Sequence, residues 1–557
     1  TNFEGYNYFA NISKRINENH QLSLTGFGAP QQHYQRSGGL TMSEWNNVRK
    51  YMKDGMHFSR FNPTYGYDDF GNQNSANYNV YHKPQISLNH IWQIDHKSSL
   101  SATAYVSLGR GYGRTAEPGL NSSYSYTDLT YGANYGTLSH TFRREDGTFD
   151  YGAVEFANSP NNPIYDPNSD QFEKMYAGSQ LVICENRNDH NWYGLTSTYT
   201  NKFADMFDFY AGIDVRYYQG KHNATISDLM GGEYFIDATR AKVKAANNAA
   251  ALDSEWMTEK LTIGDIAYRN YDGFIVQEGA FAQLEYNKDR WSAFVNGSIN
   301  YNHYWKVDYF YYDAEKGKSE VLGFLGGTIK AGANYEFNKH HNAFINLGYI
   351  SRAPNLDYGA FMNASTSNTI NVDAKNEQIA SAEIGYGFHN EYVNVAVNGY
   401  FTEWMDKTMT KSSTLSDPAQ TEYFMNMTGV NARHMGIEFE AKARPTKWLE
   451  ISAMLSLGSW KWDSDSVVGY IYDKHGQALT MDGNITEPGA ADHAWALINM
   501  KGINVGGSAQ TTANLGVTFK PFKGFRIGAE YTLYDRNYAY YSFSGSNLQL
   551  GKEMNLL

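Results

Sequence analysis

Apolar and polar residues alternate along Phe207–Tyr218. One side of this stretch carries Phe207, Phe209, Ala211, Ile213, Val215 and Tyr217, and the other carries Asp208, Tyr210, Gly212, Asp214, Arg216 and Tyr218. A period of two residues predicts a β-strand. The first side has no charge, whereas the second holds Asp214 and Arg216 together. This pattern is typical of a transmembrane barrel strand, whose residues face lipid and lumen in turn.

The same alternation recurs along the chain. Further apolar series on one parity are Leu100, Ala102, Ala104, Val106 and Leu108; Val393, Val395, Val397 and Phe401; Ile437, Phe439 and Ala441; Leu449, Ile451, Ala453, Leu455 and Leu457; Ala513, Leu515, Val517 and Phe519; and Ile527, Ala529, Tyr531 and Leu533. The exception is Phe274–Tyr286, where Glu278 shares the parity of Val276 and Ala280. We expect either a β-bulge that shifts the register or a position of Glu278 above the bilayer.

Short polar turns and long connections follow each other in turn. The short turns are Asn17–His20, Asp95–Ser98, Asn201–Asp205, Asn287–Arg290, Asn338–His341, His389–Glu391, Ala443–Lys447 and Lys520–Gly524. The long connections include Arg36–Ala76, Gly113–Arg187, Lys221–Gly273, Thr408–Asn431 and Asp463–Val505. Two of them carry short helix signals, a capping box of Thr41 with Glu44 and the alanine-rich Ala238–Trp256. Eight hairpins predict about sixteen antiparallel strands, with periplasmic turns and extracellular loops.

Composition narrows the class of protein further. The 557 residues include 45 tyrosines but no run of about eighteen apolar residues, so a helical membrane protein is excluded while a single large barrel is not. A net charge of −12 argues against a nucleic-acid partner. The single cysteine, Cys184, supports no internal disulfide.

Five short motifs resemble one family. They are GIDVRYYQGKH followed by DLMGGEYFID within Phe207–Asp237, GFGAPQ at Gly26–Gln31, YHKPQ at Tyr81–Gln85, YISRAP at Tyr349–Pro354 and GIEFE at Gly436–Glu440. Their order and their places at strand ends are similar to the barrel of TonB-dependent receptors of the Bacteroidetes type.

The resemblance implies more than the chain itself displays. The family is known for a 22-stranded barrel behind an N-terminal plug, so we expect residues 1–557 to be one barrel domain, incomplete at both ends and without its plug. It also implies a Gram-negative outer-membrane protein embedded in lipid. Its implied partners are a periplasmic TonB-type energy-coupling complex, which acts through the plug, and a surface lipoprotein.

Charged residues on the lumen parity are candidates for contact with a plug. They are Asp214, Arg216, Lys330, Glu383, Glu438, Glu440, Lys442 and Glu530. Charges in a barrel interior are tolerable because water or a plug satisfies them. The two interpretations, a wall that holds a removable plug and a simply hydrated lining, stay open.

Candidate ligand contacts lie where strands meet long loops. They are Arg352, Asp357, Tyr358, Trp460, Trp462, Tyr540 and Tyr541. Aromatic side chains near a vestibule stack on sugars, chelates or peptides. The competing interpretation is that they are girdle or plug-packing residues.

Enzyme and metal motifs are missing from the sequence. There is no HExxH, no paired CxxC and no GxSxG, and no acid, base and nucleophile cluster at one rim. Asp166–Asp170 with Glu173 has some calcium-loop spacing, but Gln171 replaces the required glycine, which favours a solvated acidic turn. We therefore expect neither catalysis nor a bound cofactor.

The leading hypothesis is an outer-membrane receptor that imports a scarce ligand, such as a siderophore, vitamin, glycan or peptide, by energy-coupled transport through a plugged barrel. The alternative is a self-sufficient sixteen-stranded diffusion porin. It fits the strand count, but it predicts shorter loops, a loop folded inward and a closing C-terminal strand.

Overall fold

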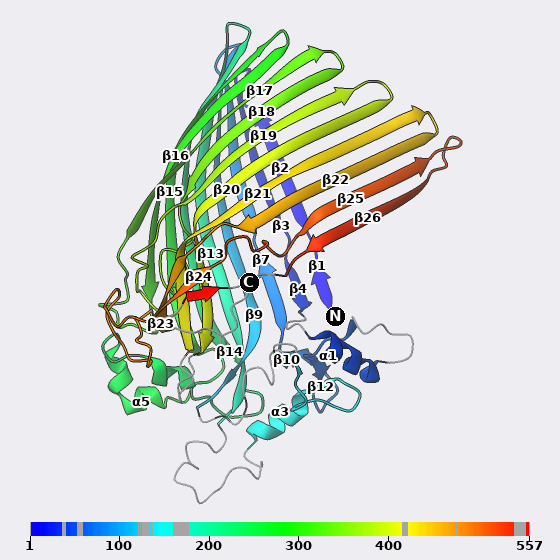
Figure 1. The fold of residues 1–557 in the computed structure, drawn as a ribbon. Coiled ribbons are helices and arrows are strands. Elements are labelled where there is room, and N and C mark those ends of the chain that lie inside the picture. The colour runs from blue at the N-terminus through cyan, green and yellow to red at the C-terminus, as the bar shows by residue number, and fades with distance from the viewer. Residues whose placement is uncertain are drawn as a thin grey trace, which may run out of the picture.

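The computed structural model is dominated by one curled, mostly antiparallel sheet (Figure 1). It describes residues 2–35, 40–52, 60–120, 122, 124, 133–134, 137–159, 178–414, 422–473, 476–539 and 553–555. The candidates Tyr540 and Tyr541 and the acidic segment at Asp166–Asp170 lie outside these residues. The predicted antiparallel barrel class is confirmed.

The sheet contains twenty-two strand segments in the described part of the chain. The segments are β1 (Phe3–Gly5), β2 (Tyr8–Arg15), β3 (His20–Gly28), β4 (Gln31–Tyr34), β7 (Tyr78–His82), β8 (Gln85–Gln93), β9 (Ser98–Pro118), β13 (Leu181–Phe203), β14 (Phe207–Asp228), β15 (Ile266–Lys288), β16 (Trp291–Asp308), β17 (Leu322–Asn338), β18 (His341–Arg352), β19 (Glu377–His389), β20 (Val393–Thr414), β21 (Glu422–Thr446), β22 (Leu449–Trp462), β23 (Val467–Asp473), β24 (Trp495–Asn499), β25 (Ala509–Phe519), β26 (Ile527–Asn537) and β27 (Glu553–Asn555).

Three rows of this sheet are interrupted. In each of these rows two short segments lie end to end in the place of one long strand: β1 with β2, β4 with β3, and β7 with β8. Along the sheet β1 pairs with β4 and β4 with β7, while β2 pairs with β3 and β3 with β8. Both β7 and β8 then pair with the long strand β9. The segments β23, β24 and β27 branch from β21 beyond the main wall. Counting each interrupted row once leaves sixteen long strands, as the hairpin rhythm predicts. No described pairing joins β26 to the first row.

The two ends of the sheet differ, as the sequence predicts (Figure 1). Short turns join the strands at the upper end in this view, here called the turn end. Long connections and all labelled helices lie at the opposite loop end, among them α1 (Met42–Asn47), α3 (Tyr151–Asn158) and α5 (Ser254–Met257). Thr41 caps α1 by accepting a hydrogen bond from the Glu44 backbone N–H at 3.2 Å. No helix in the described ranges has the length and apolarity to cross a membrane.

The two faces of the sheet follow the predicted alternation. Ile329, Ile384 and Ile437 are 59%, 64% and 59% exposed on the outer, convex face, which suits contact with lipid. Aromatic rings pair on the same face next to the turns, including Phe203 with Phe207 and Trp448 with Phe519. Such rings form the interfacial girdle of a membrane barrel.

Glu278 also lies on the outer face. Its register is continuous from Phe274 to Tyr286 against both neighbouring strands, so no bulge shifts it. Glu278 pairs with Val215 and is itself exposed. It stands about ten residues from the turn, close to the length that a strand needs to cross the apolar layer. The expected bulge is therefore wrong, and a position of Glu278 at the outer boundary of the lipid stays a prediction.

Several strands run further than the alternation predicts. Most of Thr408–Asn431, expected as a loop, belongs to the paired strands β20 and β21. Similarly, β9 extends to Pro118 and β14 to Asp228. Backbone pairing continues beyond the lipid, but the apolar and polar sorting that lipid imposes stops there. The predicted loop boundaries are wrong for this reason.

Gly212 illustrates how tightly the inner face of the wall is packed. A Cβ atom at Gly212 would lie 2.2 Å from the Ser197 carbonyl oxygen and 2.6 Å from the Phe281 ring. We expect Gly212→Ala to destabilise the barrel by about 1–3 kcal/mol, because backbone and ring must both shift. The measurement is the denaturant midpoint of the folded, heat-modifiable form in detergent. Gly399→Ala is the control, since its Cβ would meet nothing closer than Ile384 at 3.9 Å; an equal effect of both changes contradicts the prediction.

Candidate functional site

Four loops contact one another at the loop end. They are residues 229–265, 309–321, 353–376 and 463–508, here called the loop cap. Lys244 pairs with Asp473 at 3.1 Å, and the backbone N–H of Asn368 donates to the Tyr312 hydroxyl at 3.0 Å. Met362 is buried against Tyr472. These contacts link strands β14 to β25 above the lumen side of the wall.

Loop 353–376 lies on the inner face of the strands beside it. Ala360, Phe361 and Ala364 are buried against Tyr271 and Tyr304. Both tyrosines have the lumen parity, because their strands continue without a register shift from Gly279 and Asn300. The loop therefore reaches inward across several strands at the mouth of the barrel.

A hollow of about 820 Å³ lies on the inner face between β16 and β22. We call it the chamber. The polar and aromatic side chains that line it are Phe294, Lys330, Asn346, Ser381, Glu383, Tyr400, Thr402, Trp404, His434, Glu438 and Trp460. All of these residues lie on the lumen parity of seven consecutive strands. Four candidates from the sequence, Lys330, Glu383, Glu438 and Trp460, thus come together here.

Hydrogen bonds fix Trp460 in the chamber wall. Its indole N–H donates to the Tyr400 hydroxyl at 2.8 Å. Its backbone N–H donates to the Gln510 side-chain oxygen at 3.0 Å, and the Gln510 amide donates back to the Trp460 carbonyl at 2.9 Å. The ring of His434 lies 5.8 Å from the Trp460 ring. The indole face is therefore held in place before any ligand arrives.

A charged cluster stands at the loop-end rim of the chamber. Arg352 pairs with the buried carboxylate of Glu377, and Lys407 lies 3.6 Å from the same carboxylate. The Arg352 guanidinium and the Lys407 ammonium lie 5.7 and 4.7 Å from the centre of the Trp404 ring. Two cations beside one carboxylate leave an excess positive charge around an aromatic face.

Trp404 is the residue that the sequence analysis missed. Its indole N–H is buried and has no acceptor among the described residues. Trp404 lines the chamber, and an aromatic ring at a hollow is suited to stacking on a ligand. The available signal was parity: Trp404 continues the lumen series of Tyr400 and Thr402. The alternation ends directly after Trp404, because the strand register shifts between Trp404 and Lys407.

The other ligand candidates have structural surroundings. Asp357 accepts a hydrogen bond from the Ala364 backbone N–H at 2.7 Å inside loop 353–376, and burial raises the pKa of its carboxyl. Tyr358 packs its ring 5.7 Å from Phe424. Trp462 packs against the buried cluster of the loop cap formed with Met427 and Val467, outside the chamber.

The remaining lumen charges lie at separate places on the inner face. Asp214 and Arg216 pair with each other at 2.7 Å on β14. Glu530 accepts from Asn514 at 2.7 Å on the last two long strands. Lys442 pairs with Glu450 at 3.1 Å near the turn end, and Glu440 precedes it on β21. The structure does not gather all eight charges into one site.

Charges inside the chamber are left without partners of opposite sign. Within the described ranges no carboxylate lies within 4 Å of the Lys330 ammonium, and no cation lies within 4 Å of the Glu438 carboxylate. The Glu383 carboxylate accepts a hydrogen bond only from the Asn346 amide, at 3.3 Å, among these residues. No cluster of His, Cys, Asp or Glu suited to a metal ion occurs in that part of the chain. The arrangement can bind a polar ligand by stacking, ion pairing and hydrogen bonding, or a protein segment by the same contacts.

Comparisons with known proteins point to one family. The sequence matches the family described as TonB dependent receptor-like, beta-barrel over residues 6–551. Comparison with curated protein sequences gave no match.

The chain is also similar to solved structures of receptors and transporters. The siderophore receptor PiuA from Acinetobacter baumannii gives a TM-score of 0.51 at 12% identity, covering 95% of this chain and 64% of that one. The ferric citrate transporter FecA, in its unliganded form, gives 0.50 at 9% identity, covering 95% and 65%. The FrpB iron transporter from Neisseria meningitidis gives 0.47 at 13% identity, covering 94% and 58%. This chain therefore spans less than two thirds of the length of each.

Proposed function

The chain belongs to the TonB-dependent receptor β-barrel family, and from this premise we propose that it forms the wall of an outer-membrane receptor that imports a scarce ligand by energy-coupled transport. The family and the structural neighbours are receptors and transporters, and the family is one of outer-membrane barrels. The ligand enters at the loop end and passes along the inner face. No covalent change of the cargo is part of this function.

The chamber is the observation that carries the proposal. It lies inside the wall, next to the loop cap, and combines fixed aromatic faces with unpaired charges. A diffusion channel needs no such recognition surface. Trp404 and Trp460 supply the stacking faces, while Lys330 and Glu438 supply the charges that fix orientation.

The proposed partners follow from the hypothesis of energy-coupled transport. We propose a plug that occupies the lumen, a TonB-type complex that acts on the plug from the periplasm, and a surface lipoprotein above the loops. The motifs at Gly26–Gln31 and Tyr349–Pro354 support the Bacteroidetes type. The setting is the outer membrane of a Gram-negative cell, crossed many times by the chain. The ligand belongs to the siderophores, other metal chelates, vitamins, glycans or peptides.

Depletion of nutrients from the medium tests the proposal across all of these ligand classes at once. Cells that express the receptor and cells that lack it are grown in one complex medium with added ferric siderophores, copper, cobalamin and oligosaccharides. We expect one compound to be depleted only by the expressing cells. A protonophore should stop its uptake but leave its binding to the cell surface unchanged, because only transport needs the energised inner membrane.

The diffusion porin remains the alternative because sixteen long strands and an inward-lying loop suit it. A porin takes up solutes down their gradient and passes ions continuously in a planar bilayer. Uptake that resists the protonophore, together with steady conductance of the purified full-length protein, would overturn the receptor proposal in favour of the porin.

A further inference from the structure

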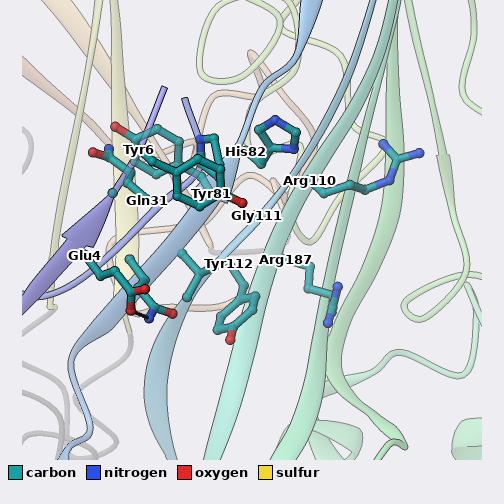
Figure 2. Close-up of a pocket in the computed structure, with 13 residues that line it drawn as sticks. Glu4, Tyr6, Gln31, Tyr81, His82, Arg110, Gly111, Tyr112 and Arg187 are labelled. Carbon is teal, nitrogen blue, oxygen red and sulfur yellow. Dashed lines mark hydrogen bonds between the residues drawn. The ribbon is translucent and has the colours of Figure 1, made fainter. Parts of the chain in front are cut away.

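A second hollow, of about 360 Å³, lies among the strands near the N-terminus (Figure 2). Residues from β1, β4, β7, β9 and β13 line it. It sits where three neighbouring rows are interrupted, at Tyr6–Asn7, Ala29–Pro30 and Lys83–Pro84. Proline lacks the N–H that a sheet ladder needs, so the wall cannot close by pairing there. We call this hollow the outer-face pocket.

The basic side chains of this pocket belong to the outer face of the sheet. Arg110 and Tyr112 continue the parity of the outward Leu108, with the same register against β7 and β8. Arg187 has the parity of Tyr193, which is 47% exposed on the outer face. The pocket therefore does not belong to the chamber, which lies on the inner face of other strands.

The distance of the pocket from the turn end shows its level relative to the apolar layer of the membrane. Arg110 follows the turn-end residue Ser98 by about twelve residues, while a tilted strand crosses the apolar layer in about nine to eleven. Leu108, 43% exposed, is the last exposed aliphatic residue on the outward parity of β9, where Ala116 is buried. Arg110 and Arg187 thus stand just past the apolar band, at the level of lipid headgroups.

Arg110 keeps a positive charge that no carboxylate offsets. Its guanidinium donates to three neutral oxygens, those of Gly109, His190 and the Asn191 side chain, at 2.7, 3.1 and 3.3 Å. No carboxylate in the described part of the chain lies within 4 Å of it. A cation at this level, held in place by neutral acceptors, is oriented for an anion from outside.

Arg187 adds a second guanidinium on the same side. Figure 2 shows Arg110 and Arg187 extending in the same direction over β13, with the Tyr112 ring beside Arg187. The centre of the Arg187 guanidinium lies 5.5 Å from the Tyr112 ring centre, and one of its nitrogens pairs with Glu185 at 2.9 Å.

Glu4, which lines the pocket, and Asp189 beside it already accept hydrogen bonds within the wall. Glu4 accepts from the Gln32 amide at 2.6 Å, and Asp189 accepts from the Gly111 backbone N–H at 2.9 Å. Neither forms an ion pair with Arg110 or Arg187 among the described residues.

We propose that the outer-face pocket binds the phosphate group of a phosphorylated glycolipid in the surrounding outer leaflet. Guanidinium groups match phosphate geometry and charge. The place of the pocket, outside the barrel and just above its apolar band, makes a lipid headgroup its natural occupant. The apolar residues below, such as Leu108, would contact the acyl chains of the same lipid.

Native mass spectrometry of the full chain in mild detergent tests this assignment. The probes are diphosphorylated lipid A, its dephosphorylated form and inorganic phosphate. We expect the wild type to bind the phosphorylated lipid, and the double variant R110Q/R187Q to bind it roughly tenfold or more weakly. Lys461→Gln, which removes an exposed outward cation on the distant strand β22, is the matched control and should leave binding unchanged.

Each outcome decides for or against the pocket. The double variant R110K/R187K keeps both positive charges but loses the paired N–H donors of the guanidinium groups, so it should bind with intermediate affinity. Heat-modifiable migration confirms that every variant is folded. Equal binding of the wild type and R110Q/R187Q, or of the phosphorylated and dephosphorylated lipids, would contradict the proposal. Equal affinity for inorganic phosphate would replace the lipid by a free anion and equally overturn it. The result is independent of whether the chain imports a ligand.

Discussion

Lys306→Met is expected to open loop 353–376, with a free-energy cost of about 3–5 kcal/mol. The Lys306 side chain is completely buried and lies 3.4 Å from the Asp308 carboxylate. Its ammonium also donates to the Ser367 carbonyl of the loop at 2.9 Å, and so joins β16 to the loop. Methionine has a similar volume but leaves Asp308 buried without a cation. Hydrogen exchange of the 353–376 backbone amides is the measurement, and we expect them to exchange much faster.

The matched control for this variant is Lys316→Met. Lys316 pairs with Asp313 at 3.1 Å, but its side chain is 51% exposed, so the pair contributes about 1 kcal/mol or less. If both variants exchange alike, the buried pair does not hold the loop.

The pH dependence gives an independent check on Lys306. Burial lowers the pKa of Lys306 from 10.5 to about 8, against the opposing effect of Asp308 and of Asp357 in the loop. Between these two values the unfolded chain binds a proton that the folded protein has released. The free energy of unfolding contributed by Lys306 therefore rises as the pH increases from about 8 to 10.5. Taking the difference between wild type and Lys306→Met cancels the titration of other groups, such as the buried tyrosines.

Trp404→Ala is expected to weaken binding of the ligand proposed for the chamber by about 2 kcal/mol, or roughly thirtyfold in Kd. The change removes from the chamber the aromatic ring over which Arg352 and Lys407 lie. The probe is the compound that only expressing cells deplete, titrated into the purified protein. Arg352→Gln and Trp460→Ala should reduce binding in the same direction.

Trp448→Ala is the control for this prediction. Trp448 is an aromatic residue of the same size on the outer face at the turn end, 45% exposed and packed on Phe519. Its loss should leave the affinity unchanged. An unaltered affinity of Trp404→Ala, in a protein with normal heat-modifiable migration, would remove Trp404 from the ligand site.

The membrane-spanning wall could be predicted from the sequence because lipid imposes a simple rule on it. Each outward residue within the apolar layer of the membrane meets hydrocarbon, so the series through Ile213 or Ile437 repeats with period two and marks each strand. The turns follow for the same reason, since polar residues interrupt the series at fixed intervals. Glu278 breaks this series without a bulge, because strand pairing continues through it on both sides.

The loop end could not be predicted in the same way. Its buried clusters combine residues from distant segments, such as Met425 with Ile498 and Val243 with Phe310. The sequence contains no periodic pattern that predicts which loops pack against each other. Trp460 could be predicted because the alternation around it is regular. Trp404 lies two residues before Asp406, whose φ of +58° interrupts the alternation.

The contact between Lys244 and Asp473 constrains the order in which the protein assembles. The two residues are separated by 229 positions, and the strands from β15 to β22 lie between them. A contact of such sequence separation forms only after the intervening chain has been ordered, since the entropy of closing so long a loop is otherwise unopposed. The loop cap is therefore a late product of biogenesis. Its protection from proteases added outside the cell reports that the strands beneath it have already been inserted.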